Sequence, residues 1–337
     1  MNIWKLTIVC MAMLAFVVGG ARADDKVKIS IGTDGFVHLP LFVAYDAGLF
    51  KKQGLDVEIV KFKGGGAAMS GLAGGSVDMC SCSVQNAINA SAKGVKVKLI
   101  GVLVDQYASN VVVTEKTAEK IGLTATMPME ERLKALKGLR IAVAGAGGSA
   151  DFLVRHLAAA AGLSPESDLS LLYMNDSAGM LASFEADRID GFALSSPTSD
   201  VAILSYGGKM LVDMAAGQYK PLAGYPSISL SAREDWLSGN RDKAVKFLRA
   251  LEEADKMIHG DAKRAKAAVR ERFALTKDDV FSAAWDANKA SYPDTPEITL
   301  DSVKRAIDFL AGIQGEKIEG DPSAFFDTSY AEEALKN

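Results

Sequence analysis

Few side chains of this sequence could carry out chemistry, and His38 is the most suggestive of them. It lies in the run Phe36-Val-His-Leu-Pro40, directly after a predicted strand, where an imidazole could contact a ligand or act as an acid or base. The other two histidines, His156 and His259, fall within predicted helices and are expected to be surface or core residues. Three scattered histidines do not make a general acid–base constellation, and the sequence contains neither a G-x-S-x-G nor an H-E-x-x-H motif.

The cysteines are too few for a disulfide framework. Cys80 and Cys82 are separated by one serine in a predicted strand, so their side chains point to the same face. Cα atoms two residues apart in a strand are about 6.5–7 Å from each other, at the limit of disulfide reach. We therefore expect two free, semi-buried thiols. A metal site would need further histidines or cysteines nearby in space, and no metal or cofactor is expected.

Two other patterns resemble catalytic or nucleotide motifs. Gly145-x-Gly-x-x-Ala150 follows a predicted strand and opens a helix, as a dinucleotide fingerprint does, but no acidic residue stands about 20 residues further on to bind a ribose. Asp78 and Asp190 each precede a strand, at the end away from the predicted cleft. We expect them to have turn or capping roles.

These residues are positioned by elements that occur twice in the same order. The first copy of strand, helix, strand, helix, strand covers residues 27–31, 40–49, 56–62, 64–72 and 77–82. The second covers residues 139–143, 149–161, 169–174, 177–184 and 189–194. The spacing between Asp78 and Asp190 nearly equals that between the pairs Gly48-Leu49 and Gly162-Leu163, which favours a structural duplication.

Alternating strands and helices predict parallel sheets with helices on both faces. We predict an α/β fold of two doubly wound lobes joined by a two-strand hinge, with extra C-terminal helices that pack on lobe 1. Strands at residues 110–114 and 228–231 are expected to carry the chain across and back. The predicted divisions are 24–112 for the first part of lobe 1 and 113–214 for lobe 2. Residues 215–337 are predicted to form the return strand and the C-terminal helices that complete lobe 1.

The N-terminus predicts export. Lys5 precedes thirteen uncharged residues, 6–18, and Ala21-Arg22-Ala23 suits signal peptidase, so we expect cleavage after Ala23 and a periplasmic protein. Thirteen apolar residues are too few to span a bilayer, and Cys10 lies in a poor lipid-attachment box. The net charge is −4, which gives no electrostatic footprint for nucleic acid.

Ligands of open parallel sheets bind beyond the carboxyl ends of the strands. Six loops meet that condition, and all are rich in Gly, Ser, Asn or Ala: residues 32–39, 64–67, 81–86, 145–150, 175–179 and 195–199. Several open helices, whose N-termini favour anions. Hydroxyl groups come from Ser81, Ser83, Ser149, Ser195 and Ser196. A small, neutral or singly anionic molecule would suit such loops, whereas a polyphosphate would not.

The run from residue 36 to 59 resembles the opening of solute-binding proteins for ABC importers of nitrate, sulfonates, taurine and thiamine-pyrimidine precursors. Further similar segments are 72–78, 138–149, 188–191 and 241–262. The resemblance implies the type 2 periplasmic-binding-protein fold, closure around a ligand and docking of the closed form on a membrane permease. By position, it also implies a ligand pocket made by Gly35, Phe36, His38, Gly65, Gly66, Ala67, Ser81, Cys82, Ser83, Gly147, Gly148, Ser149, Ser196 and Pro197.

The prediction is therefore an exported, monomeric binding protein, not an enzyme, that holds a small organic ligand of anionic or heteroaromatic character. Backbone N–H groups would hold its polar end, while Phe36 and His38 would cover its organic body. Two alternatives stay open. The resembled group includes thiamine-pyrimidine synthases, enzymes that consume a histidine of the first loop, where His38 stands; and closure could equally serve a sensor that presents ligand to a receptor.

Overall fold

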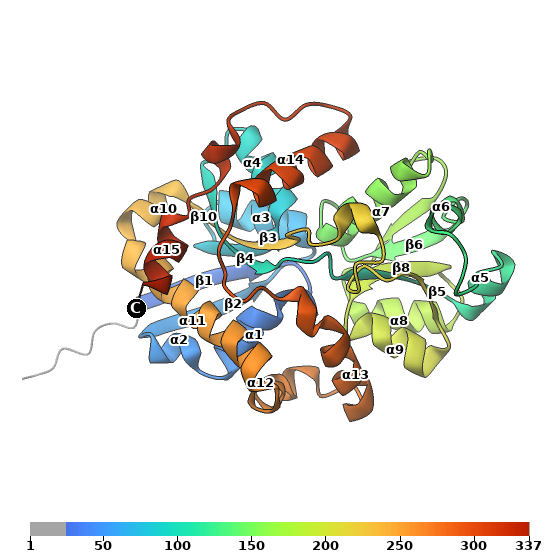
Figure 1. Ribbon diagram of the computed structural model, residues 1–337, viewed down its shortest axis with the longest axis horizontal. Coiled ribbons are helices and arrows are strands. Elements are labelled where there is room, and N and C mark those ends of the chain that lie inside the picture. The colour runs from blue at the N-terminus through green and yellow to red at the C-terminus, as the bar shows by residue number, and fades with distance from the viewer. Residues whose placement is uncertain (1–24, 337) are drawn as a thin grey trace, which may run out of the picture.

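The computed structural model of this protein describes residues 25–336, which form two lobes side by side (Figure 1). Each lobe is built on a five-stranded sheet with helices on both faces. The predicted signal sequence, with Lys5, Cys10 and the cleavage site after Ala23, lies outside the described residues. None of the helices in the described part of the chain has the length and apolar character that a membrane crossing requires.

The sheet of lobe 1 has the strand order β2-β1-β3-β10-β4. Its strands are β1 (Asp25–Ile31), β2 (Leu55–Lys61), β3 (Met79–Ser83), β4 (Val97–Val104) and β10 (Ile228–Arg233). Val27, Ile29 and Ile31 alternate along β1, so they all pack against one layer of helices. That layer consists of α1 (Leu39–Asp46), α2 (Leu49–Lys52) and α11 (Arg241–Gly260). The opposite face is covered by α3 (Gly65–Ala73), α4 (Val84–Ala92) and α14 (Leu300–Gln314).

The sheet of lobe 2 repeats this plan with the order β7-β6-β8-β5-β9. Its strands are β5 (Ser109–Val113), β6 (Arg140–Val143), β7 (Ser170–Tyr173), β8 (Gly191–Ser195) and β9 (Lys209–Val212). On one face lie α5 (Glu115–Lys120), α6 (Met129–Lys134) and α7 (Ser149–Ala160). On the other lie α8 (Ser177–Glu185) and α9 (Thr198–Tyr206).

The chain crosses between the lobes twice, as predicted: once between Val104 and Ser109, and back between Val212 and Ile228. The prediction that both sheets are wholly parallel is wrong. β5 runs antiparallel to β8 and β9, and β10 runs antiparallel to β3 and β4. Each of these strands enters its sheet from the other lobe, which reverses its direction. The predicted boundary between residues 112 and 113 falls inside β5.

Two aspartates mark the same position in the two lobes. The Asp78 carboxylate accepts the Lys28 N–H (2.8 Å), just before β1 begins to pair with β3, and the Asp190 carboxylate accepts the Arg140 N–H at the start of β6 (2.7 Å). Both therefore cap a neighbouring strand, as predicted, at the end of the sheet away from the lobe junction. Their shared role supports the duplication that the spacing predicted.

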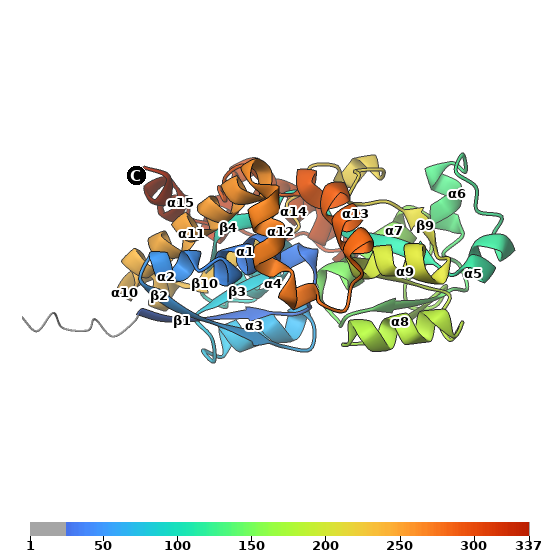
Figure 2. The same cartoon turned by 90° about the horizontal axis from the view of Figure 1, so that it is seen from below.

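The C-terminal helices reach further than predicted. The short helix α10 (Glu234–Gly239) precedes α11. After α11 come α12 (Ala262–Val269), α13 (Asp278–Asn288), α14 and α15 (Ser329–Leu335). Most of them pack on lobe 1, and Trp285 is buried in that core while Trp236 packs against it half-buried. However, α13 lies beside α9 of lobe 2 (Figure 2), and Phe309 of α14 stacks on His156 of α7, with ring centroids 4.7 Å apart. The segment just after α13 is also bonded to the first crossing, because the Asp105 N–H donates to the Ser291 carbonyl (3.1 Å).

Candidate functional site

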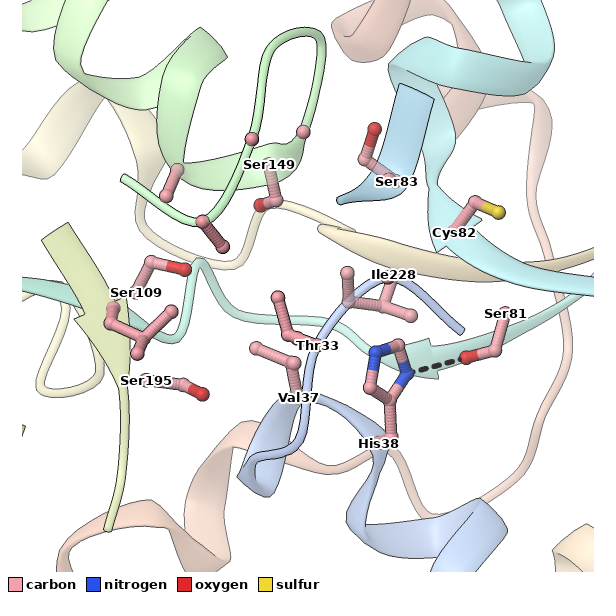
Figure 3. Close-up of a pocket in the computed structure, with 17 residues that line it drawn as sticks. Thr33, Val37, His38, Ser81, Cys82, Ser83, Ser109, Ser149, Ser195 and Ile228 are labelled. Carbon is pink, nitrogen blue, oxygen red and sulfur yellow. Dashed lines mark hydrogen bonds between the residues drawn. The ribbon is translucent and has the colours of Figure 1, made fainter. Parts of the chain in front are cut away.

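A cavity of about 40 Å³ lies at the lobe junction (Figure 3). It is placed beyond the carboxyl ends of β1, β3, β6 and β8, where ligands of such sheets bind. Both lobes and both crossing strands contribute to its wall. The lining residues are Gly32, Thr33, Val37, His38, Gly65, Ser81, Cys82, Ser83, Ser109, Ala144, Gly145, Gly148, Ser149, Ala150, Leu194, Ser195 and Ile228.

His38 provides the imidazole of the cavity. It ends the short helical turn Phe36–His38, and Pro40 follows as the second residue of α1, in the first turn, where proline is tolerated. The ring is 3 % exposed, and its Nδ1 lies 2.8 Å from the Ser81 Oγ. Burial lowers the pKa of His38 to about 4, against a smaller opposing effect of Asp34. At neutral pH the cavity therefore presents an uncharged ring that can donate or accept a hydrogen bond.

Hydroxyl groups from both lobes surround the remaining space. Ser83 caps the N-terminus of α4, where its Oγ accepts the Asn86 N–H and donates to the Asn86 Oδ1 (2.6 Å). Ser149 is the first residue of α7. The Ser195 Oγ, at the end of β8, is buried and has no hydrogen-bond partner within the protein. A buried hydroxyl without a partner costs free energy, and a ligand group that reached this oxygen would supply the missing bond.

No lysine or arginine lines the cavity among the residues that the structure describes. The positive potential at the site comes instead from the N-termini of α3, α4 and α7, whose first turns face the junction. Asp151 holds the α7 end in place, because its carboxylate accepts the Gly147 N–H (2.8 Å) and pairs with Arg155 (3.0 Å). The arrangement can hold a neutral molecule or a single negative charge.

Glycines close the cavity on one side, where two loops meet backbone to backbone. A Cβ added to Gly145 would lie 2.9 Å from the Gly64 Cα, and one added to Gly66 would lie 2.7 Å from the Ala146 carbonyl oxygen. The Asn86 side chain crosses this seam and donates to the Gly147 carbonyl (2.6 Å). The Gly145 motif that resembled a dinucleotide fingerprint is thus packed against lobe 1, which leaves no room for a pyrophosphate in this arrangement.

Seven of the fourteen predicted pocket residues line the cavity. These are His38, Gly65, Ser81, Cys82, Ser83, Gly148 and Ser149. Gly66 and Gly147 lie in the glycine seam, and Ala67 is in the first turn of α3. Gly35, Ser196 and Pro197 lie where lobe 1 meets lobe 2 outside the cavity, and the Phe36 N–H donates to the Ser196 carbonyl (2.8 Å).

The prediction that the Phe36 ring covers the ligand is wrong. Phe36 is fully buried and its ring packs edge-on against Phe273, Phe281 and Trp285, with centroids 5.2–6.2 Å apart. The ring turns away from the cavity because the C-terminal helices offer it an aromatic pocket. Val37, the next residue, takes the place at the cavity wall.

Four lining residues lie outside all the loops that the sequence singled out. Ser109 and Ile228 are the first residues of the two crossing strands, and Ala144 and Leu194 lie at the ends of β6 and β8. The sequence could have indicated Ser109 and Ile228, since a strand that crosses into a lobe must begin at the lobe junction. The other six, Gly32, Thr33, Val37, Gly145, Ala150 and Ser195, fall inside the predicted loops.

The expectation of two free, semi-buried thiols is also wrong. The structure joins Cys80 and Cys82 in a disulfide, and both residues are almost fully buried. Their Cα atoms are 5.4 Å apart, closer than in a regular strand and within ordinary disulfide reach. Within residues 25–336, no three His, Cys, Asp or Glu side chains are grouped as metal ligands.

Comparison with known proteins agrees with this geometry. Residues 22–271 match the model of the NMT1-like family. The chain belongs to that family. It is 23 % identical over 308 residues to the binding protein YtlA of Bacillus subtilis, covering 89 % of this chain and 88 % of YtlA. It is 25 % identical over 255 residues to the nitrate/nitrite binding protein NrtA of Nostoc, and this match covers 70 % of the chain and 56 % of NrtA.

Solved structures show the same fold as this member of the NMT1-like family. A structure from Bordetella bronchiseptica superimposes with a TM-score of 0.82 at 26 % identity, covering 92 % of this chain and 96 % of that one. The alkanesulfonate-binding protein SsuA of Xanthomonas axonopodis, bound to MOPS, gives 0.69 at 18 % identity, covering 92 % and 97 %. The chain thus has the periplasmic-binding-protein fold, and its structural neighbours are binding proteins of the nitrate and sulfonate group.

Proposed function

We propose that this protein is an exported solute-binding protein that captures a small ligand by closure of its lobes and delivers it to an ABC importer in the membrane. The observation that carries the proposal is the cavity at the lobe junction, whose wall comes from both lobes. A ligand in it makes all its contacts only in the closed form, so binding shifts the protein toward closure. No covalent step is required.

The cavity suits a small polar or anionic head group. A water molecule needs about 10–15 Å³, so a cavity of about 40 Å³ accommodates roughly three to four non-hydrogen atoms. Nitrate, carboxylate and sulfonate groups are of that order. A smaller space beside it shares Thr33, Ala144 and Leu194 with the cavity wall and has Asp34 and Lys61 at its far side. An organic ligand could extend its body in that direction.

Native mass spectrometry of the protein purified from its export compartment tests the proposal first. A retained small molecule is expected, followed by stabilisation when nitrate, sulfonates, pyrimidines and aromatic carboxylates are screened by thermal shift. Saturation at a hundred times Kd stabilises a protein by about 2.7 kcal/mol. The absence of both a retained mass and any stabilising compound would contradict the proposal.

Ser195→Ala sharpens this test. Loss of a neutral hydrogen bond of about 1–1.5 kcal/mol predicts a roughly tenfold weaker Kd. The stability of the free protein should not fall and should rise slightly, because the substitution removes a buried hydroxyl that has no partner within the protein. Ser70→Ala, on the exposed side of α3, is the matched control. Equal affinity of Ser195→Ala and wild type would remove Ser195 from the ligand site.

A second candidate is an enzyme related to thiamine-pyrimidine synthesis. The yeast protein THI11, a 4-amino-5-hydroxymethyl-2-methylpyrimidine phosphate synthase, is 24 % identical over 235 residues, and His38 lies in the cavity. The disulfide of Cys82 removes the thiolate that such an enzyme could use. Turnover of a bound pyrimidine that is abolished by His38→Ala would favour the enzyme, and capture of a histidine kinase in place of a permease would favour a sensor.

A further inference from the structure

A cluster of hydrogen bonds joins the two lobes outside the cavity and centres on Ser196, in the loop after β8. The Ser196 carbonyl accepts the Phe36 N–H (2.8 Å), and the Ser196 Oγ accepts the Asn288 side-chain amide (2.7 Å). The Tyr292 hydroxyl completes the cluster by donating to the Phe36 carbonyl (3.0 Å). Ser196 and Asn288 are fully buried, and neither lines the cavity.

Within its own lobe, the Ser196 hydroxyl also bonds the Asp200 carboxylate of α9. Its other partners, the Phe36 N–H and the Asn288 amide, belong to the body of lobe 1. Phe36, Trp285 and Tyr292 share one hydrophobic core with the strands of the first sheet. Asn288, at the end of α13, is held by a second hydrogen bond from its amide to the Ala284 carbonyl (2.8 Å). Lobe 1 therefore presents a fixed donor pair to a single residue of lobe 2, beside α9 (Figure 2).

We propose that Asn288 and Ser196 form a latch that holds the two lobes in the closed form from outside the cavity. This inference rests on the proposed function, because it concerns the closure that traps the ligand. Asn288 is a positioning residue: it acts on the site through Ser196, whose neighbour Ser195 lines the cavity. Asn288 and Tyr292 lie beyond residues 22–271, so the family match does not include this part of the latch.

The latch and the glycine seam differ in the interactions that are broken when the lobes open. At the seam, close backbone approach needs glycines, and only Asn86 bridges the loops with its side chain. At the latch, opening separates two donor–acceptor pairs that are buried in the closed form, and each such pair contributes to stability. The latch therefore favours the closed form whether or not a ligand is present. It predicts a measurable closed population in the free protein.

Double electron–electron resonance on the ligand-free protein tests the latch. Nitroxide labels on Ala73→Cys in α3 and Ala182→Cys in α8 report the distance between the lobes, since both side chains are exposed and stand away from the junction. Wild type should show a closed and an open distance. Asn288→Ala and Ser196→Ala should each reduce the closed-to-open ratio about tenfold, which corresponds to about 1.4 kcal/mol. The double variant should reduce the ratio by less than the two single effects multiplied together, because both substitutions remove the Asn288–Ser196 bond.

The control is Gly312→Ala in α14, where an added Cβ meets nothing within 4 Å. Urea unfolding of each variant separates the latch from general stability, since a purely structural role would lower stability without changing the ratio. Additive effects of the two substitutions, an unchanged ratio or a wild type that never closes would each overturn the latch. A changed ratio in a protein that binds no ligand would support the latch and reject the proposed function.

Discussion

His38 should make the stability of this protein depend on pH in a way that a glutamine at the same place would not. Burial lowers the pKa of its imidazole from 6.5 to about 4. Between these values the unfolded chain takes up a proton at this residue and the folded protein does not. The free energy of unfolding therefore falls as pH decreases from about 6.5 and stops falling near pH 4. A difference of about 2.5 pKa units corresponds to about 3 kcal/mol.

The measurement is urea unfolding at pH 7, 6, 5 and 4, followed by tryptophan fluorescence. His156 needs a correction, because burial also lowers its pKa to about 4. The comparison is therefore made between His156→Gln and the double variant His38→Gln/His156→Gln. Their difference in stability should change by about 3 kcal/mol between pH 7 and pH 4. Parallel curves would refute the reasoning, since they would mean that His38 has the same pKa in the folded and the unfolded protein.

Three further predictions follow from the packing. Gly66→Ala should prevent full closure without unfolding lobe 1, because its Cβ would meet the Ala146 carbonyl oxygen at 2.7 Å. Small-angle X-ray scattering with a bound ligand should show the open form for this variant and the closed form for the control Gly312→Ala. Burial and neighbouring carboxylates raise the pKa of Asp255 well above its ordinary value, so its contribution to stability should fall as pH rises above about 4, where the unfolded chain ionises first. Asp255→Asn should lack this fall and be the more stable protein at pH 7 in urea unfolding. Phe36→Ala should cost about 3–5 kcal/mol of unfolding free energy by loss of core packing, and a loss of affinity at unchanged stability would contradict its place in the core.

Much of the fold could be predicted because it depends on local patterns. The repeated order of strands and helices and the matching positions of Asp78 and Asp190 are visible in the sequence, and the structure gives both aspartates the same capping bond. The direction of β5 and β10 could not be predicted in this way. It depends on which sheet each strand joins, and that is decided by residues far away in the chain.

Some features of the cavity could likewise be predicted from the sequence, and others could not. Loops at the carboxyl ends of strands are placed by topology, so His38, Ser81 and Ser149 could be predicted to lie together. The direction of the Phe36 ring could not, because its pocket is built by Phe273, Phe281 and other residues more than 230 positions later. Resemblance also placed Ser196 at the ligand, whereas the structure places it between the lobes.

The most direct test of the account is a crystal structure of the protein with the ligand identified by mass spectrometry. The account predicts an ordered molecule in the cavity that touches His38 of lobe 1 and Ser195 of lobe 2, with its polar end at the N-termini of α4 and α7. A ligand bound elsewhere, or in contact with one lobe only, would contradict it.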